Sequence, residues 1–437
     1  MIVTILLAVT LVLAGRFSPL HRETVYQYAS EHEHLLRPET QHFPVHSTKV
    51  TQTLQEVNIP SSSINSPCKS NISQRGSGYF NFAEALSLPC TESEGFEISL
   101  LDPRHVEHLE VNINASILIK GCNTNQTIWS IDSQNNGIIN LVQGDLTINN
   151  IEFQFTTIDI PVSYITPSNW FIYGGRQGYS TSLIVNECIF QSTSGQSRDS
   201  MIQIVVIDSK KVEISKSIFN GLSYYQPSSI SMIFADNCSY VSVKKCIFRD
   251  AFIVTTQSAV ELQTKVENGS IIVEECEFIN IISNRYPLLA TLKVRGDIKF
   301  KATINKNNFT NCSATDSFSG ALYVVDSSHE DISEFIITNN IFRNNSGNNA
   351  GAIYLNSLNP KSKFNFNNNI FSMNKNNVTD SIGCDVYIMI NYYSYNQTSN
   401  ITGDVIKNWF KGSKLILLMR AFIMRHIRME IQQNLEI

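Results

Sequence analysis

The sequence predicts an all-β fold: a right-handed parallel β-helix, in which the chain winds through successive coils of a solenoid. Three observations predict it. Phenylalanine recurs at a nearly constant interval, a short β-prone run precedes each phenylalanine, and turn-forming Ser, Asn, Asp, Lys and Gly separate the runs. A period of roughly 20–50 residues built on strands is typical of a β-solenoid.

The phenylalanines are spaced by 37, 29, 29, 30, 31, 33 and 29 residues, and each ends a run such as VEISKSIF or VSVKKCIF. Neighbouring strands of a sheet lie about 4.8 Å apart, so a residue type kept at one position of every coil forms a ladder along the solenoid. We expect one buried ladder of eight rings: Phe153, Phe190, Phe219, Phe248, Phe278, Phe309, Phe342 and Phe371.

A second β-rich run, such as MIQIVVID or GALYVVDS, lies 12 to 20 residues before each later phenylalanine. A coil of about 30 residues therefore holds two clear strands and has room for a third short one. The runs contain Asn, Val and Ile rather than strong helix formers, which favours strands over a helical repeat.

Two further ladders flank the phenylalanines. The position two residues before each ring points inward with it, because side chains alternate along a strand. Buried thiols pack as small apolar groups and are poor nucleophiles, and stacked Asn amides can hydrogen-bond from coil to coil, so we expect structural roles. The first ladder is Ile151, Cys188, Ser217, Cys246, Cys276, Asn307, Asn340 and Asn369; the second, three residues after the ring, ends Cys312, Asn345, Asn374.

The chain divides into four predicted regions. Residues 2–14 form an uncharged, mainly apolar run that is too short to span a bilayer comfortably, which favours a signal peptide over residues 1–15 and hence secretion or display at the cell surface. Residues 16–75 form an irregular polar lead, and residues 76–403 form one β-helix whose first coils are less regular. An insert over 161–178 is expected to project as a loop with Trp170, Phe171 and Tyr173 near its tip.

The tail, residues 404–437, is basic and apolar and predicts a helical segment. Three interpretations stay open for it: a cap over the last coil, an amphipathic helix that contacts a membrane surface or a partner, and a misread gene end.

The nine cysteines include Cys68 and Cys90, which precede the coils and could close a loop over the N-terminal end. Cys246 and Cys276 fall on adjacent coils, but parallel side chains give poor disulfide geometry. Secretion would also expose eleven N-x-Ser/Thr sequons, some of them on turns that can carry glycans. The sequons begin at Asn71, Asn114, Asn125, Asn237, Asn268, Asn308, Asn311, Asn344, Asn377, Asn396 and Asn400.

Charge and motif content exclude several functions. The net charge is −5, charged residues make up only 16% of the chain, and no basic stripe or readout motif predicts nucleic-acid binding. Seven of the nine histidines precede the clear coils, and EHEH at 31–34 does not match a zinc motif. We expect no metal and no cofactor.

Two late coils carry a family resemblance. Ser319–Tyr323 reads SGALY and Ala350–Tyr354 reads AGAIY, and Phe342–Asn345 and Phe371–Asn374 fit F-x-x-N. These motifs resemble the GGA[I/L/V] and FxxN repeats of chlamydial polymorphic outer membrane proteins and of related protist surface proteins. The resemblance implies a pectin-lyase-like right-handed β-helix with a surface or adhesive role and no catalytic residues. One Gly replaces the family's pair.

An enzymatic alternative is a polysaccharide lyase or glycoside hydrolase that uses carboxylates on adjacent coils. Asp208 and Asp236 follow their β-rich runs at similar positions and could act as acid and base or hold Ca²⁺, whereas the next coil has Lys265 there. No Asp-Asp pair, Gly-His-Gly or Arg-x-x-Lys cluster accompanies them.

The sequence therefore favours a non-catalytic, secreted or cell-surface β-helix that presents an extended face to host or matrix glycans or proteins. Exposed tyrosines are candidates for such contacts, although turn filling or end capping explains them equally well. The candidates are Tyr224, Tyr225, Tyr392, Tyr393 and Tyr395.

Overall fold

The computed structural model describes residues 68–76, 78–90, 94–122, 126–131, 137–155, 169–175, 180–192, 201–221, 230–253, 258–283, 290–315, 317–328, 331–359, 361–377, 385–392, 408–413, 415–423 and 427–435. All of them belong to one compact unit, Thr48–Ile437. The predicted signal peptide (1–15) and nearly all of the polar lead (16–75) lie outside these residues.

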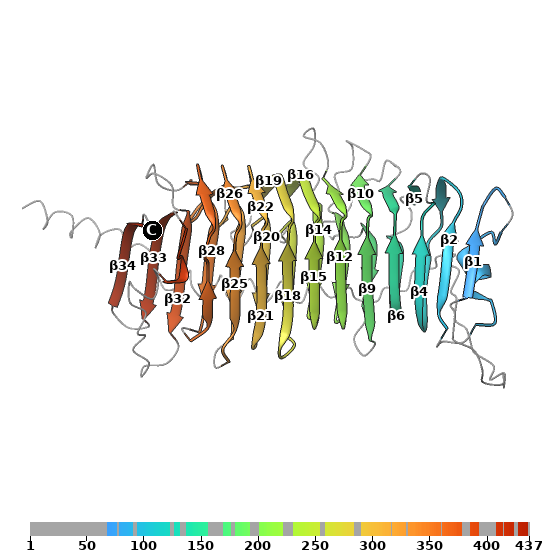
Figure 1. Ribbon diagram of the computed structural model, residues 1–437, viewed down its shortest axis with the longest axis horizontal. Coiled ribbons are helices and arrows are strands. Elements are labelled where there is room, and N and C mark those ends of the chain that lie inside the picture. The colour runs from blue at the N-terminus through green and yellow to red at the C-terminus, as the bar shows by residue number, and fades with distance from the viewer. Residues whose placement is uncertain are drawn as a thin grey trace, which may run out of the picture. The chain divides into compact units, whose positions relative to one another are not determined.

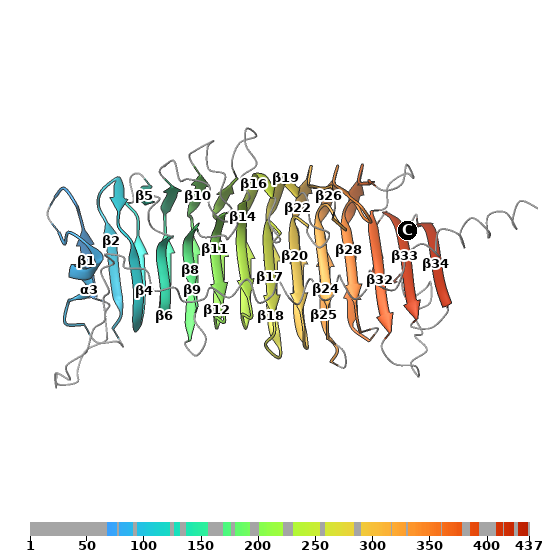
Figure 2. The same cartoon turned by 180° about the vertical axis from the view of Figure 1, so that it is seen from behind.

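The chain forms an all-β parallel β-helix, as predicted. Successive coils follow one another in chain order, and each contributes a strand to three parallel rows (Figures 1 and 2). Rows 1 and 2 belong to a 21-stranded sheet and row 3 to a 13-stranded sheet. The third strand of the coil, for which the sequence left room, is row 3 itself, and it carries the phenylalanine.

The strands of each row are as follows. Row 1 consists of β8 (Asn169–Gly174), β11 (Met201–Ile207), β14 (Ile230–Asp236), β17 (Val260–Thr264), β20 (Leu292–Gly296), β24 (Leu322–Asp326), β28 (Ile353–Ser357) and β32 (Val386–Tyr392). Row 2 consists of β9 (Thr181–Asn186), β12 (Lys211–Ser215), β15 (Tyr240–Lys244), β18 (Gly269–Glu274), β21 (Phe300–Asn305), β25 (Glu334–Thr338) and β29 (Lys363–Asn365). Row 3 consists of β3 (Arg104–Val106), β5 (Thr127–Ile131), β7 (Ile151–Phe155), β10 (Ile189–Ser192), β13 (Ile218–Asn220), β16 (Ile247–Ile253), β19 (Glu277–Ser283), β22 (Asn308–Thr310), β26 (Ile341–Arg343) and β30 (Ile370–Ser372), with the short strands β23 (Ser313–Ala314), β27 (Ser346–Gly347) and β31 (Lys375–Asn376) beside it.

The first coils are less regular, as expected of a solenoid end. Strands β4 (Leu109–Lys120) and β6 (Gly137–Asn149) are long, and β6 pairs with both β8 of row 1 and β9 of row 2. Strand β1 (Cys68–Ile72) pairs in parallel with β2 (Phe96–Leu100). Because β1 already belongs to the sheet, the solenoid begins before residue 76, inside the range predicted as an irregular lead.

The eight phenylalanines form the predicted ladder. Each pairs in register with the next along row 3, and neighbouring rings stack with centroids 4.5–5.2 Å apart. All are buried except Phe371, which is half-buried on the last coil. Trp129 continues the ladder at the N-terminal end, 5.9 Å from Phe153, and Phe82 stacks on Trp129 at 5.1 Å. The sequence analysis missed these last two rings.

The predicted Asn ladders are buried and bonded from coil to coil. The Nδ2 amide of Asn307 donates to Oδ1 of Asn340, and that of Asn340 donates to Oδ1 of Asn369, each at 3.0 Å. Oδ1 of Asn340 also accepts the backbone N–H of Asn307 at 2.9 Å. Asn345 and Asn374 repeat this arrangement, also at 3.0 Å. Each amide therefore satisfies backbone groups that would otherwise be buried without partners.

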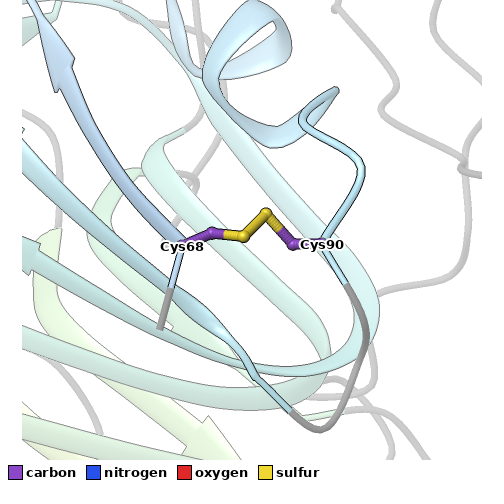
Figure 3. Close-up of a disulfide and its surroundings, with 2 residues drawn as sticks. All are labelled: Cys68 and Cys90. Atoms are coloured by element: carbon purple, nitrogen blue, oxygen red, sulfur yellow. A yellow bond between two sulfur atoms is a disulfide. The ribbon is translucent and has the colours of Figure 1, made fainter. Parts of the chain in front are cut away.

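A disulfide and a short helix close the N-terminal end (Figure 3). Cys68 on β1 is bonded to Cys90, as the sequence predicted, with their Cα atoms 6.1 Å apart. Between them lies helix α3 (Phe82–Leu86), whose N-cap Asn81 accepts the N–H of Glu84 at 2.9 Å. The helix places Phe82 over Trp129, so this end of the core is covered.

The helix predicted over 404–437 is wrong for most of its length. Strand β33 (Leu415–Ile423) pairs in parallel with β32, and β34 (Ile427–Leu435) pairs antiparallel with β33. The open edge of β32 offers a full set of backbone hydrogen bonds to the apolar tail, and this pairing outweighs a weak helix propensity. Among the described residues, no helix combines the length and the hydropathy needed to cross a membrane.

The capping role considered for the tail is filled by residues 408–413. Phe410 is buried and stacks on Phe366 at 4.7 Å. The hydroxyl of Ser413 accepts the N–H of Asn369 at 2.9 Å and so ends the Asn ladder.

The loop predicted around Trp170, Phe171 and Tyr173 is also corrected. These residues lie in strand β8. Phe171 is buried in the core, 5.9 Å from both Phe153 and Phe190, whereas Trp170 and Tyr173 belong to a separate apolar cluster. Packing an aromatic side chain against two stacked rings removes its apolar surface from water, which is more favourable than exposing it on a loop.

We predict that Phe278→Ala lowers the free energy of unfolding by about 3–5 kcal/mol, because a fully buried ring between two stacked neighbours leaves a cavity. Urea unfolding monitored by circular dichroism measures the change. A loss below about 0.5 kcal/mol would be typical of a surface position and would contradict the ladder's role.

Candidate functional site

The outward side of row 1, which we call the row-1 face, gathers charged and aromatic side chains. Two ladders run along it because alternate residues of each strand point outward. The first consists of Tyr173, Val205, Phe234, Glu261, Lys293, Tyr323, Tyr354 and Tyr387. The second consists of Ile207, Asp236, Gln263, Arg295, Val325, Asn356 and Met389.

A nearly buried ion pair interrupts the first ladder. Nζ of Lys293 lies 2.8 Å from Oε1 of Glu261, and the two side chains are 11% and 4% exposed. The same Oε1 accepts a hydrogen bond from Nε2 of Gln263, and Oε2 accepts the backbone N–H of Ser258 at 3.2 Å. The carboxylate is therefore fully engaged, which is the condition under which a buried charge is tolerated.

Asp236 ends strand β14 beside this pair. Its Oδ2 lies 3.4 Å from Nζ of Lys265, whereas its buried Oδ1 accepts no hydrogen bond within the described residues. Burial raises the pKa of the Asp236 carboxyl, Lys265 opposes this shift, and the nearby carboxylates of Glu261 and Asp208 add to it. Carboxyls with a raised pKa beside other charged groups are common at functional sites.

Asp208 lies on the preceding coil, as the sequence predicted, but one residue out of register with Asp236. Ile207 pairs with Asp236, so Asp208 falls opposite Asn237, whose Nδ2 donates to Oδ1 of Asp208. The backbone N–H of Asp208 donates to the carbonyl of Asp236 at 3.0 Å. Both carboxylates thus belong to the rim of the row-1 face.

The second ladder is the part of the face that meets solvent. Arg295 is 33% exposed and its Nε donates to Oδ1 of Asp297 at 2.8 Å. Ile207, Val325, Asn356 and Met389 are half-buried. Among the described residues, Lys293 and Arg295 on this face and Lys265 beside it each lie within ion-pairing distance of a carboxylate: Lys265 with Asp236, Lys293 with Glu261, and Arg295 with Asp297.

Aromatic clusters flank the charged centre on both sides along the row. Trp170 and Tyr173 lie 5.1 Å apart next to Phe234 on the N-terminal side. On the C-terminal side Tyr354 stacks on Phe318 at 4.8 Å and on Tyr387 at 5.1 Å. Along the row the polar centre therefore lies between two aromatic clusters, of which Tyr323, Tyr354 and Tyr387 are buried, whereas Trp170 and Tyr173 are partly exposed.

The side chains of the tyrosines predicted to contact a ligand are not placed by the described part of the structure. The predicted ligand-contact tyrosines Tyr224, Tyr225, Tyr393 and Tyr395, and the side chain of Tyr392, lie outside the described residues. The described part of the chain brings together no three His, Cys, Asp or Glu side chains able to hold a metal ion.

The coils hold several buried cysteines, and burial raises the pKa of some of their thiols. Burial raises the pKa of Cys188 and of Cys238 to about 12, and that of Cys312 to about 11. Cys246 and Cys276 remain free thiols on adjacent coils, as their geometry predicted. Thiols held in the neutral form are poor nucleophiles, which supports a packing role.

Sequence analysis identified the two aspartates but missed Glu261, Lys293 and Arg295. A usable signal was present: in the runs SAVEL, ATLKV, GALYV and GAIYL, the fourth residue is Glu, Lys, Tyr and Tyr. Aligning these runs places two opposite charges on successive coils. The alternation of strand faces then predicts a cross-strand ion pair.

A scan against protein-family models found no match for this chain. A search of curated proteins also found no match.

We predict that Lys293→Met destabilises the protein by about 3–5 kcal/mol, because it leaves the Glu261 carboxylate buried without its cation. The double variant Lys293→Met/Glu261→Leu should recover most of this loss, since an apolar pair of similar volume can replace a buried ion pair. Chemical unfolding of the parent and of both variants measures this. Equal losses in the single and double variants would contradict it.

We predict a pH-dependent difference in stability between the parent and Asp236→Asn. The raised pKa means that the folded state holds the Asp236 proton more tightly than the unfolded chain does. The parent's stability relative to the variant should therefore be greatest at and below the ordinary carboxyl value of 3.8, and should fall as pH rises to the folded pKa. Thermal melts between acid and neutral pH test the sign; an opposite slope would contradict the burial effect.

Proposed function

We propose that this protein is a non-catalytic, secreted or cell-surface β-helix that binds glycans through the row-1 face. The observation that supports this proposal is the second ladder, in which Asp236, Arg295 and Asn356 are half-exposed, with the partly exposed rings of Trp170 and Tyr173 on its N-terminal side. Ligand sites commonly combine apolar and aromatic surface with a few fixed polar groups, and Tyr and Trp supply both a ring face and a polar atom.

The pairing of charges favours a neutral glycan over a strongly anionic one. With Lys265, Lys293 and Arg295 each beside a carboxylate, the centre carries little net charge, whereas binding of acidic chains needs uncompensated cations. Paired charges still present acceptors and donors in fixed positions for hydroxyl groups. The resemblance to polymorphic outer membrane protein-type repeats, with a pectin-lyase-like β-helix and an adhesive role, supports the same proposal.

Binding to an array of neutral and acidic glycans tests the proposal with the full chain. Arg295→Ala and Asn356→Ala on the second ladder should each weaken binding about tenfold or more, equivalent to about 1.4 kcal/mol. Lys301→Ala is the matched control, since it removes an exposed cation in row 2 that pairs with Glu334 at 3.0 Å. Unchanged glycan binding in both ladder variants, or an equal loss of binding in the Lys301→Ala control, would refute the assignment of the face. Capture of a host protein without any glycan would indicate a protein partner instead.

One observation favours a second candidate, a polysaccharide lyase or glycoside hydrolase. Asp236 has a raised pKa, its carbonyl accepts the backbone N–H of Asp208 on the preceding coil, and two neighbouring carboxyl groups are the usual acid and base of glycoside hydrolysis. Release of reducing ends that Asp236→Asn abolishes would support the enzyme. Binding without turnover would favour the first proposal.

A further inference from the structure

Two sequons occupy the same connection on successive coils and differ in their surroundings. Asn237-Cys238-Ser239 joins β14 to β15, whereas Asn268 is the last residue between β17 and β18, and Gly269 and Ser270 of its sequon begin β18. The backbone N–H of Ser270 donates to the carbonyl of Ser239 at 3.0 Å, so the two sequons lie side by side. Both asparagines adopt the left-handed conformation, with φ of 55° and 59°.

The side chain of Asn268 is exposed, and within the described residues its amide has no side-chain partner. Its backbone N–H donates to the carbonyl of Lys299 at 2.9 Å, so the residue is fixed while the amide is left in solvent. Gly269 makes this turn possible, because a Cβ there would lie 2.3 Å from Oγ1 of Thr264. A bulky group attached to Nδ2 of Asn268 would therefore leave the fold unchanged.

Asn237 presents the opposite case. It is half-buried, and its Nδ2 donates to the Asp208 carboxylate. The middle residue of its sequon, Cys238, is fully buried. A sugar on this Nδ2 would separate the amide from Asp208 and press against the rim of the row-1 face.

We propose that Asn268 is an N-glycosylation site and that Asn237 is unmodified in the folded protein. This inference rests on the secretion included in the proposed function. The reaction forms a bond between Nδ2 of Asn268 and the anomeric carbon of a lipid-pyrophosphate-linked oligosaccharide. The bond from that carbon to the pyrophosphate oxygen breaks, the pyrophosphate leaves with the electron pair, and Nδ2 loses one proton.

The glycan would lie close to the candidate binding surface. Lys265, which pairs with Asp236, is three residues before Asn268 on the same connection. Sugar attached there would border one side of the row-1 face without replacing any of its polar groups. Approach of a large ligand from the row-2 side would then be restricted.

The test uses the full chain with its own N-terminus, expressed in a eukaryotic cell line that adds N-glycans. Secreted or surface-held protein is isolated and treated with an amidase that converts occupied Asn to Asp, and the peptides are examined by mass spectrometry. We expect conversion at Asn268 and none at Asn237. Conversion of Asn237 to Asp, or an Asn268 that stays unconverted, would overturn the inference. An unconverted Asn268 is also the result expected if the chain does not enter the compartment that holds the oligosaccharide donor, and it overturns the inference in that case too.

Matched variants separate attachment from folding. Asn268→Gln and Ser270→Ala should each remove one glycan and increase the electrophoretic mobility, whereas Asn237→Gln should leave the mobility unchanged. Mass spectrometry of the parent decides the assignment even where a variant folds poorly. Glycan-array binding is a separate measurement. If Asn268 carries a glycan but the protein binds no glycan on the array, only the proposed function is contradicted. If the protein binds glycans but Asn268 is unmodified, only the glycosylation inference is contradicted.

Discussion

In-register stacking of successive coils is the constraint on which the rest of this structure depends. A parallel β-helix places each residue about 4.8 Å from its counterpart on the next coil, so both coils must follow the same backbone path. The turn before row 3 shows how strictly this holds. The third residue before each phenylalanine has a positive φ in all eight coils, although it is Glu or Lys in five of them and Asn in only three: Asn150, Glu187, Lys216, Lys245, Glu275, Lys306, Asn339 and Asn368. Such a conformation is costly for residues other than Gly. Hydrogen bonds compensate for the cost, because the N–H at this position donates to a carbonyl of the following coil, as from Glu187 to Ser215 and from Lys216 to Lys244.

Stacking also decides which side chains each position accepts. Inside the solenoid, identical side chains can stack on one another: phenylalanine rings lie flat on the rings of neighbouring coils, and each Asn amide donates a hydrogen bond to the next. Outside, opposite charges meet at most steps where this turn position is charged on both coils, and Lys216 next to Lys245 is the exception. Glu187 lies 2.9 Å from Lys216, and Glu275 lies within 3.9 Å of both Lys245 and Lys306. Each of these exposed pairs contributes little stability. Their main effect is that opposite charges avoid the repulsion that would disfavour stacking the coils in register.

The interior could be predicted from sequence because its ladders repeat a residue type at a fixed interval. The positions of Phe278 and Asn340 can be recognised because the same residue type recurs about 30 residues away on each side. The ends could not be predicted in the same way. Trp129 and Phe82 continue the ring ladder from a long first coil and a helix, where no period links them to Phe153. The tail was predicted as a helix from its composition, but composition contains no information about the unpaired edge of β32 that turns Leu415–Ile423 into a strand. The candidate site was predicted in part, since Asp208 and Asp236 stand out as acidic residues after β-rich runs, whereas Glu261 and Lys293 lie within such runs.

The ion pair between Glu261 and Lys293 is the strongest reason to expect function on the row-1 face. Its neighbours in the same ladder are Phe234 on one side and Tyr323 on the other, so aromatic residues fit this position of the coil. Apolar residues of similar volume would stabilise the fold as well as or better than a nearly buried ion pair. Stability alone therefore does not explain two charges in the middle of an aromatic ladder. Asp236, with its raised pKa and a buried oxygen that has no partner among the residues the structure places, adds a second polar group that the fold does not need. A repeat that departs from its own pattern at a cost to stability is typical of a functional surface, and here we propose that the half-exposed Arg295 and Asn356 beside the pair meet the ligand.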